Sequence, residues 1–316
     1  MLFNTIEFVI FFISILSIFI IFKNRKFHHY FLLVAGFLFF YWSNNYLITL
    51  LIFSILLDFY VGKEIFKAKT ITRKKSLLIL SLVGNLGLLG FFKYSDFAIA
   101  QFNILGNYIN LTDSIPFLNL ALPIGISFYT FQTISYTVDI YRGQLKPSNS
   151  LREFAIFVSF FPQIVAGPIL RAKDFLPQLN EKMEKLKISK LRLITLEKTS
   201  FRIGVAMMAL GFFKKMFFAD NIAPMVNDIF AMPVGLESFT IIWGTIGFGI
   251  QVYGDFSGYS DIAIGAALIL GFKIPANFNK PFFATSPSEF WRRWHISLSS
   301  WVKDYLFLPI IYRKIG

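Results

Sequence analysis

The chain has 316 residues, of which 55% are hydrophobic and only 16% are charged, and its mean hydropathy is +0.60. This composition excludes an ordinary water-soluble globule and predicts a protein whose solvent is lipid. The formal net charge of +13 does not indicate a nucleic-acid-binding protein, because the basic residues lie in short segments between apolar runs. The sequence has no cysteine, which excludes disulfides and thiol catalysis.

Several apolar runs approach the length of about 20 residues that a helix needs to cross a bilayer. They are Phe3–Phe22, Tyr46–Val61, Leu77–Phe92 and Phe239–Val252. Lipid offers no partners for free backbone N–H and C=O groups, so a spanning segment must be a helix or part of a closed barrel. These runs are unbroken rather than alternating, which predicts an all-α, polytopic transmembrane helical bundle. The first run lacks the basic segment and cleavage site of a secretory signal, and we expect it to be a membrane helix.

The basic residues predict the orientation of this bundle. They cluster after the first two runs, at Lys23, Arg25, Lys26, Lys63, Lys67, Lys69, Arg73, Lys74 and Lys75. The positive-inside rule places both loops in the cytoplasm and the N-terminus outside. Arg142, Lys146 and Arg152 predict another cytoplasmic loop, and the basic, amphipathic stretch from Lys182 to Arg202 predicts a helix on the cytoplasmic membrane surface.

The segment from Phe154 to Leu170 lies between two regions that both look cytoplasmic, and it contains Pro162, Gly167 and Pro168. We expect it to dip into the membrane and return. Backbone of this kind is tolerated at membrane depth only where protein or a water-filled cavity surrounds it. The sequence shows no repeat, low-complexity linker or soluble domain. Residues 1–316 are therefore predicted to form a single membrane domain with re-entrant segments and amphipathic surface helices.

Polar groups are concentrated in the segment Q-V-Y-G-D-F-S-G-Y-S-D-I-A-I-G, from Gln251 to Gly265. It carries Asp255, Ser257, Tyr259, Ser260 and Asp261 directly after an apolar run. Ionisable residues at membrane depth usually face a bundle interior or an aqueous cavity. The segment is therefore either the wall of a cavity that binds substrate or a polar loop at the level of the lipid headgroups.

The next segment, A-T-S-P-S-E-F-W-R-R-W-H-I-S-L-S-S-W, predicts the start of a helix. Ser286 can cap the helix, Pro287 suits its first position, and Glu289 completes a capping box. Glu289 can also pair with Arg293 one turn later.

If this helix is continuous, its side chains divide into two faces. One broad face carries Trp291, Trp294, Leu298 and Trp301, and His295 and Ser299 stack one turn apart on another. The tryptophans and arginines are typical of an interfacial helix. This interpretation does not account for His295, which is either a structural or a catalytic histidine. Arg292 and Arg293 can bind the phosphates of a nucleotide-type thioester or those of lipid headgroups.

The sequence resembles the membrane-bound O-acyltransferases, and within them the inner-membrane alginate O-acetyltransferase branch. The matching segments occur in the order found in the family and cover most of the chain after Leu122. They are L-P-I-G-I-S-F-Y-T-F-Q-T-I-S-Y-T-V-D-I-Y-R-G (Leu122–Gly143), F-P-Q-I-V-A-G-P-I (Phe161–Ile169), Gln251–Gly265, N-F-N-K-P (Asn277–Pro281) and E-F-W-R-R-W-H-I-S-L-S-S-W (Glu289–Trp301).

The resemblance implies a ring of helices around a funnel that crosses most of the bilayer. It implies acyl transfer from a cytoplasmic donor, acetyl-CoA or another acyl thioester, to a hydroxyl acceptor, for O-acetylation of an exported polysaccharide such as alginate. It also implies a multi-pass protein of the bacterial inner membrane that works with an extracytoplasmic acyltransferase or hydrolase-like partner. Neither a bound cofactor nor a metal ion is expected.

The resemblance also assigns residues. His295 corresponds to the first of two family histidines and is the expected catalytic residue. The second, usually in a Leu-Trp-His-Gly setting, would lie beyond Gly316, so we expect a C-terminally truncated chain that carries half of the catalytic pair. The candidate substrate-binding residues are Asp255, Ser257, Tyr259, Asp261, Trp291, Arg292, Arg293, Trp294 and Ser299.

Two other functions fit the same residues. Broken helices, glycines and intramembrane acids are also typical of transporters. The repeated halves that many transporters show are not found in this sequence. A non-catalytic scaffold of a polysaccharide-modifying complex is the second alternative, and substrate-dependent acyl transfer distinguishes an enzyme from both.

Overall fold

The computed structural model describes residues 3–22, 25–108, 114–165, 167–189, 198–231 and 235–315. Within these ranges every regular element is a helix, which confirms the all-α prediction. The elements are α1 (Ile6–Ile21), α2 (Arg25–Asn44), η1 (Asn45–Leu47), α3 (Ile48–Lys67), α4 (Ile71–Tyr108), α5 (Ile126–Tyr141), α6 (Leu151–Val158), α7 (Phe161–Ile164), α8 (Ala172–Ser189), α9 (Lys198–Phe212), η2 (Phe213–Ala219), α10 (Asp220–Ala231), α11 (Ser238–Ile269), η3 (Pro281–Phe283), α12 (Pro287–Arg293), α13 (Ile296–Val302), η4 (Lys303–Phe307) and α14 (Leu308–Ile315).

Two helical stretches of the described residues are long and apolar enough to cross a membrane. They are Phe27–Lys67, which includes α3, and Ile71–Tyr108, which is α4. The apolar helix Ile6–Ile21 is shorter than a full span. The predicted run Phe239–Val252 forms the first half of α11, whose 32 residues continue into the polar segment, and α11 does not meet the same criterion.

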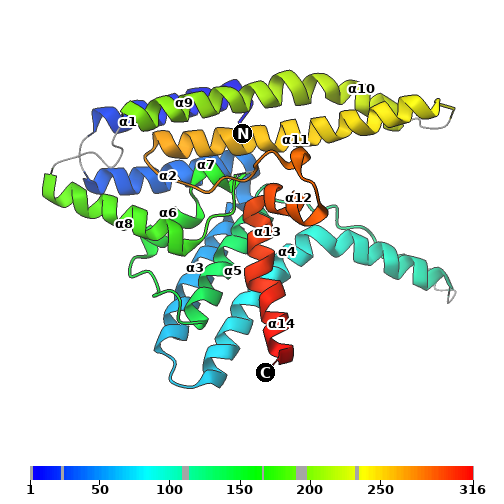
Figure 1. Cartoon of the computed structure of the whole chain (residues 1–316). Helices are drawn as coiled ribbons and strands as arrows, with labels where there is room; N and C mark the ends of the chain where they lie inside the picture. Colours follow the sequence, from blue (N-terminus) through cyan, green and yellow to red (C-terminus); the bar gives the residue numbers. More distant parts are fainter. Residues whose placement is uncertain are drawn as a thin grey trace.

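A phenylalanine-rich core joins the first eight helices to α11. Phe39, Phe154, Phe157, Phe160 and Phe161 are almost fully buried in it. Helices α3, α4 and α5 pack against one another, and α6 and α7 lie where α2, α3 and α11 meet (Figure 1). The core therefore forms around the segment that the sequence analysis expected to be re-entrant.

That segment, Phe154–Leu170, folds as two short helices, α6 and α7, followed by extended chain. Every residue described between 154 and 170 is buried. The chain around Gly125 approaches α7 so closely that a β-carbon on Gly125 would lie 2.3 Å from the carbonyl oxygen of Ile164. Protein thus surrounds this irregular backbone, as backbone at membrane depth requires.

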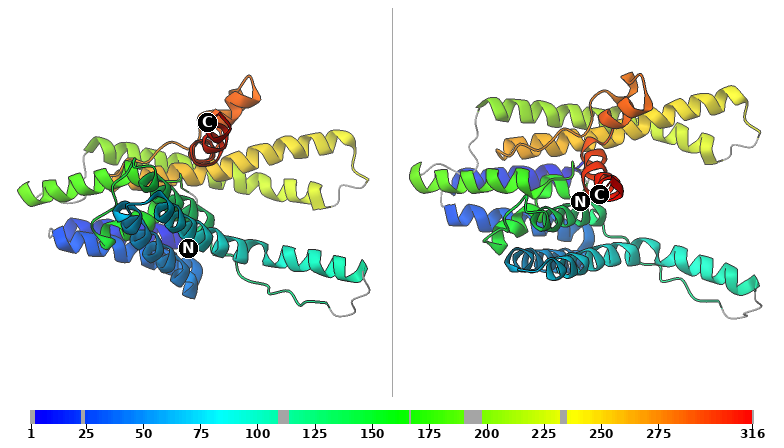
Figure 2. Two further views of the ribbon diagram at one scale, coloured as in Figure 1. Left: turned by 90° about the horizontal axis from the view of Figure 1, so that it is seen from below. Right: turned by 60° about the horizontal axis from the view of Figure 1, so that its bottom comes forward.

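Helices α9, α10 and α11 lie side by side as one layer, shown in Figures 1 and 2. The segment η2 between α9 and α10 is a π-helix. Glycines allow the close contact of α9 with α11, because a β-carbon on Gly258 would lie 2.8 Å from the carbonyl oxygen of Gly211 and one on Gly265 would lie 2.5 Å from that of Gly204. This layer places the polar half of α11 beside η2.

The structure describes both ends of the stretch from Lys182 to Arg202 as helical, and its location on the membrane surface stays a prediction. Helix α8 covers its beginning and α9 covers its end, whereas residues 190–197 lie outside the described residues. Helix α8 extends away from the core at one side of the molecule (Figure 1).

Candidate active site

The predicted long helix after Pro287 is wrong beyond Arg293, because the chain breaks at His295. Helix α12 ends at Arg293, and α13 begins at Ile296. His295 caps α13 with φ +42°, a left-handed conformation that is uncommon for a residue with a side chain. Such strain persists where the surrounding structure over-determines it and is concentrated at functional sites.

Backbone hydrogen bonds to the segment around Asn277 stabilise the break between α12 and α13. Ile296 donates its backbone N–H to the Asn277 carbonyl oxygen at 2.9 Å, and Asn279 donates to the Arg293 carbonyl oxygen at 2.9 Å. These bonds engage backbone groups at the break that a continuous helix would pair internally. Tertiary bonds to residues 19 and 14 positions upstream therefore replace the helical ones.

The start of α12 follows the prediction. The Ser286 side chain accepts the Glu289 backbone N–H at 3.2 Å. Glu289 reaches back to Thr285, whose backbone N–H and hydroxyl both donate to it at 2.8 Å. The predicted pair of Glu289 and Arg293 is confirmed at 2.6 Å.

Because the helix breaks at His295, the candidate side chains Trp291, Trp294 and Ser299 have different surroundings from one another. Trp291 is 58% exposed, whereas Trp294 packs among the rings of Tyr253, Phe278, Phe282 and Phe290. Ser299 follows His295 by one helical turn, since its backbone N–H donates to the His295 carbonyl oxygen at 2.9 Å, and its hydroxyl donates to the Trp294 carbonyl oxygen at 3.2 Å. Ser299 therefore supports the backbone of the break.

The His295 ring is partly buried between aromatic side chains. The Phe256 ring meets it edge-on with centroids 4.6 Å apart, and the Phe128 ring stacks at 6.4 Å. His295 lies outside both helices that are long enough to span a membrane. Burial lowers the pKa of His295 to about 4, since desolvation disfavours the imidazolium. The ring is therefore neutral near pH 7.

Asn277 is the polar partner of this ring. Its Oδ1 lies 3.1 Å from His295 Nδ1. The same oxygen accepts the backbone N–H and the hydroxyl of Ser297, at 3.2 and 2.8 Å. The Asn277 side-chain amide donates to Ser260 Oγ at 3.2 Å, so α11 joins the network. Asn277 was not predicted as a site residue, although N-F-N-K-P had been noted as a family segment, and Ser260 was predicted only as one of the polar groups of a cavity wall.

The acids of α11 have lysine partners from η2. Asp261 pairs with Lys214 at 2.6 Å, and Asp255 pairs with Lys215 at 2.5 Å. Lys215 also pairs with Asp220 at 2.7 Å. Each acid is thus paired with a cation inside the helical layer, and its expected place on a cavity wall stays a prediction.

Tyr259 and Ser257, the other two polar candidates of α11, have no recorded contact with His295 among the described residues. The Tyr259 hydroxyl donates to Asn4 at 3.0 Å. Ser257 is fully buried, and its hydroxyl has no hydrogen-bond partner among the described residues. Phe256 and Ser260 are the α11 residues that contact His295 and its partner Asn277.

The two arginines of α12 differ in their surroundings. Arg293 is engaged by Glu289 and donates to the Lys280 carbonyl oxygen at 3.4 Å. Arg292 is exposed. Binding of donor phosphate by either arginine stays a prediction.

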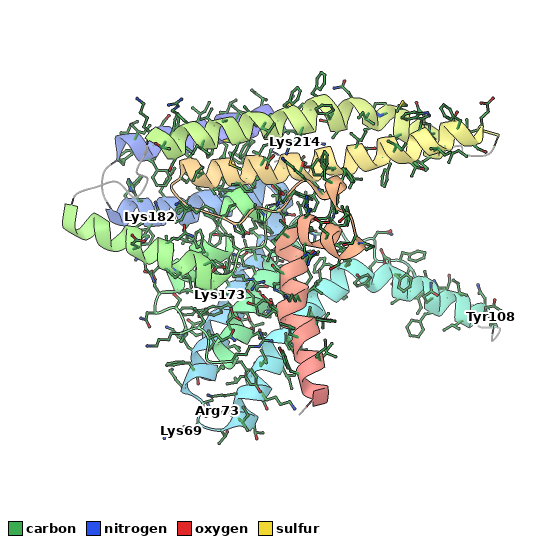
Figure 3. The ribbon with its side chains drawn as sticks, viewed as in Figure 1. Lys69, Arg73, Tyr108, Lys173, Lys182 and Lys214 are labelled. Atoms are coloured by element: carbon green, nitrogen blue, oxygen red, sulfur yellow. The ribbon has the colours of Figure 1, made fainter. Side chains whose placement is uncertain are left out.

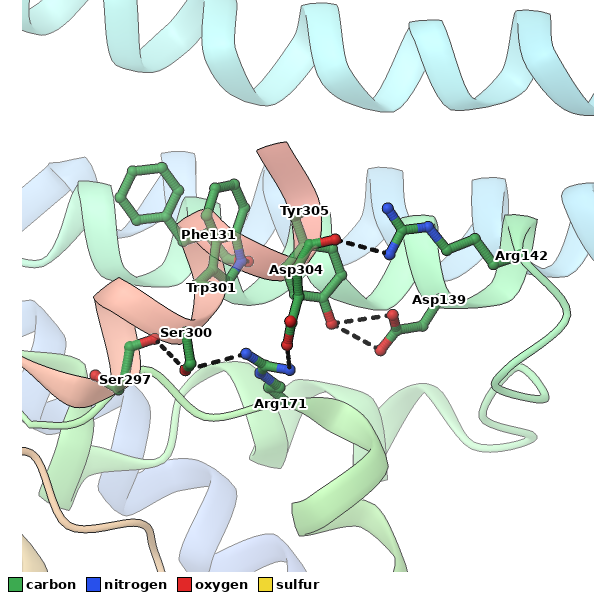
Figure 4. A network of polar contacts seen from close by, with 9 residues as sticks. All are labelled: Phe131, Asp139, Arg142, Arg171, Ser297, Ser300, Trp301, Asp304 and Tyr305. Atoms are coloured by element: carbon green, nitrogen blue, oxygen red, sulfur yellow. Dashed lines mark hydrogen bonds and ion pairs between the residues drawn. The ribbon is translucent and has the colours of Figure 1, made fainter. Parts of the chain in front are cut away.

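A second polar network anchors the C-terminal helix (Figure 4). Arg171 pairs with Asp304 at 2.6 Å and donates to Ser300 at 3.1 Å. The Tyr305 hydroxyl donates to Asp139 at 2.9 Å, and Arg142 donates to the Asp304 carbonyl oxygen at 3.1 Å. A cavity of about 220 Å³ opens beside these residues. The network reaches the His295 site because Ser300 Oγ donates to the Ser297 carbonyl oxygen at 3.0 Å.

The sequence of this chain is similar to those of known membrane-bound acyltransferases. The family model of MBOAT, the membrane-bound O-acyltransferase family, matches residues 142–315. The chain is 40% identical over 258 residues to the probable alginate O-acetylase AlgI of Pseudomonas aeruginosa, covering 80% of this chain and 46% of that protein. It is 35% identical over 288 residues to the peptidoglycan O-acetyltransferase of Helicobacter pylori, covering 83% and 52%.

A more distant relative is the teichoic acid D-alanyltransferase of Bacillus subtilis, 32% identical over 198 residues, covering 61% of this chain and 47% of that protein. The chain thus spans about half the length of the curated relatives it matches. The family match covers more than half of the chain and includes α12, the break at His295 and α13. The chain therefore belongs to the membrane-bound O-acyltransferase family.

Proposed function

We propose that this protein is a membrane-bound O-acyltransferase that transfers acetyl groups to hydroxyls of an exported polysaccharide. Family membership supports the reaction class. Two relatives that cover at least 80% of the chain are named for O-acetylation, one of alginate and one of peptidoglycan. Both act on carbohydrate polymers, so a polysaccharide hydroxyl is the proposed acceptor.

The observation that carries the proposal is the neutral, partly buried imidazole of His295, held at a break between two short helices. A positioned imidazole can accept a proton from an attacking hydroxyl. In the proposed reaction the hydroxyl oxygen bonds to the carbonyl carbon of the thioester, and the carbon–sulfur bond breaks. The hydroxyl proton passes through His295 to the departing thiolate.

The proposed donor is acetyl-CoA or another acyl thioester that arrives from the cytoplasm, and the proposed location is the bacterial inner membrane. Basic side chains support this orientation. Lys69 and Arg73 lie together at the turn between α3 and α4, at one end of the molecule (Figure 3). The positive-inside rule assigns that end to the cytoplasm. We further propose that the protein works with an extracytoplasmic acyltransferase or hydrolase-like partner.

Acyl transfer in proteoliposomes tests the proposal. The purified protein is supplied with radiolabelled acetyl thioester and a soluble polysaccharide, and His295→Ala and His295→Gln variants are compared with it at equal thermal stability. We expect thioester-dependent labelling that falls by about 10²- to 10⁴-fold in both variants, the usual worth of general acid–base catalysis. Wild-type rates in both variants would remove His295 from the mechanism. Absence of any transfer by the folded protein would reject the acyltransferase proposal.

A further inference from the structure

We infer that Asn277 is a positioning residue that fixes His295 as the Nδ1–H tautomer and leaves Nε2 as the nitrogen that exchanges protons with substrate. The statement about the tautomer rests on hydrogen-bond geometry alone. The statement about substrate rests on the proposed acyltransferase function. The two can be tested separately.

The orientation of the Asn277 amide is the first step. The oxygen and nitrogen of an asparagine side chain have nearly the same shape, and their hydrogen-bond partners tell them apart. A backbone N–H can only donate, and that of Ser297 points at one atom of the Asn277 amide at 3.2 Å. That atom must therefore be the oxygen. The amide nitrogen then faces the Ser260 hydroxyl, 3.2 Å away, which can accept.

The Ser297 hydroxyl agrees with this assignment. It accepts the backbone N–H of Ile169 at 3.0 Å, and its own hydrogen can point at Asn277 Oδ1, which lies 2.8 Å away. The Ser297 backbone N–H thus sets the orientation of the amide, and the Ser297 hydroxyl adds a second donor to the same oxygen.

The tautomer of His295 follows from this orientation. Nδ1 of His295 lies 3.1 Å from the Asn277 oxygen, which is an acceptor only. Two lone pairs cannot form a hydrogen bond, so Nδ1 must carry the hydrogen. A neutral imidazole has a single N–H, and the lone pair therefore resides on Nε2.

The contacts of the His295 ring restrict its orientation. Its edge-on contact with Phe256 and its stacking on Phe128 offer no hydrogen-bond partner that could replace Asn277. Turning the ring over would move Nδ1 away from the only side-chain oxygen recorded beside it among the described residues. The left-handed backbone at His295 further restricts where the ring can point.

During transfer, Nε2 takes the proton of the acceptor hydroxyl as the new carbon–oxygen bond forms. The ring becomes an imidazolium, whose Nδ1–H still points at the Asn277 oxygen. The proton then leaves Nε2 for the thiolate, and the original tautomer is restored. Asn277 thus keeps one nitrogen occupied through the whole cycle, so the proton enters and leaves at Nε2.

Nitrogen NMR of ¹⁵N-histidine-labelled protein in detergent tests the tautomer directly. The sequence has three histidines, so the His295 signals can be assigned by their loss in His295→Gln. We expect a protonated Nδ1 and an unprotonated Nε2. The opposite pattern would overturn the inference even if the enzyme is active. The expected pattern in a protein without transferase activity would support Asn277 positioning while rejecting the proposed function.

Variants of Asn277 test the consequence for the reaction. Asn277→Asp keeps an oxygen acceptor but adds a negative charge, which should raise the pKa of His295 and move the acid limb of the pH–rate profile up by about 1 to 3 pH units. Asn277→Leu removes the acceptor, and its transfer rate should fall by about 10²- to 10⁴-fold. The matched control is Asn279→Asp, since Asn279 is exposed and contributes its backbone N–H; its acid limb should stay in place. An unmoved acid limb in folded Asn277→Asp would overturn the inference.

Discussion

The guanidinium of Arg171 lies 2.6 Å from the carboxylate of Asp304, and this ion pair joins the chain before α8 to the C-terminal helix. The Arg171 side chain is only 13% exposed, and it also holds Ser300 of α13. A single buried guanidinium therefore holds two successive turns of the helical segment that follows His295.

Replacement of Asp304 by Asn should loosen this attachment. The variant leaves Arg171 largely buried with a weaker partner, and we expect a loss of about 1 to 2 kcal/mol in unfolding free energy, since Asp304 itself is partly exposed. Thermal unfolding in detergent measures the effect, and Lys303→Gln, at an exposed neighbouring position, serves as control. Equal melting temperatures for Asp304→Asn and the wild type would contradict this account.

The pH dependence of transfer should reflect the low pKa of His295. The folded pKa is about 4 and the ordinary value is 6.5, so the ring stays neutral in the folded protein between these values. We expect the contribution of His295 to kcat/KM to be flat from pH 8 to about pH 5 and to fall as pH approaches 4. A break near pH 6.5 that disappears in His295→Gln would show that the ring titrates normally.

The same shift affects stability with a defined sign. Between pH 4 and 6.5 the unfolded chain binds a proton at His295 and the folded protein does not. Stability therefore rises with pH across this window and is independent of His295 above it. In His295→Gln this part of the pH dependence should be absent from melting curves recorded between pH 4 and 7.

Glycine substitutions in α11 should have opposite effects at two positions. In Gly258→Ala the new β-carbon would lie 2.8 Å from the Gly211 carbonyl oxygen and 3.0 Å from the Lys215 nitrogen, both backbone atoms that cannot turn aside. We expect a loss of about 1 to 3 kcal/mol from this overpacking. In Gly249→Ala nothing lies within 4 Å, and the change should stabilise the helix by up to about 1 kcal/mol. Melting temperatures that change in the same direction would contradict the packing argument.

Glu289→Gln tests the cap of α12. Hydrogen bonds from the Thr285 backbone and hydroxyl, together with Arg293, lower the pKa of Glu289 to about 2 from 4.5. The stabilisation is therefore fully present above pH 4.5 and is lost as pH falls toward 2. The variant should melt below the wild type at pH 7, and the difference should narrow progressively below pH 4.5. A difference that persists unchanged at pH 2.5 would exclude ionisation as its cause.

Local features of this site could be predicted from the sequence, because they join residues three or four positions apart. The Ser286 cap and the pair of Glu289 and Arg293 are examples, and both are confirmed. The break at His295 could not be predicted, since Trp294 and His295 are compatible with a helix and the bonds that replace helical ones come from Asn277. Side-chain faces that periodicity assigns on one continuous helix therefore do not carry across the break at His295.

The lysine partners of Asp255 and Asp261 also could not be predicted from the sequence. Asp255 and Asp261 could be recognised as polar groups with a cost of burial, but Lys214 and Lys215 lie some forty residues earlier in an apolar segment. Their pairing depends on how α9, η2 and α11 are packed, which hydropathy does not specify. The residues around Arg171 were missed for the same reason, because Asp304 is 133 positions away.

The π-helix η2 accommodates one extra residue within the layer formed by α9, α10 and α11. The positions before it that face α11, Gly204 and Gly211, and those after it, Ala219 and Val226, meet the same neighbour. A π-helix bonds residues five apart instead of four, so Gly211 and Ala219, which are eight positions apart across η2, face α11 as do the pairs seven positions apart on either side. Deletion of one residue between Phe213 and Ala219 would restore the seven-residue spacing of an α-helix, and Val226 would still face α11. The extra residue therefore matters for where Lys214 and Lys215 lie opposite their acids, rather than for which face of α10 meets α11.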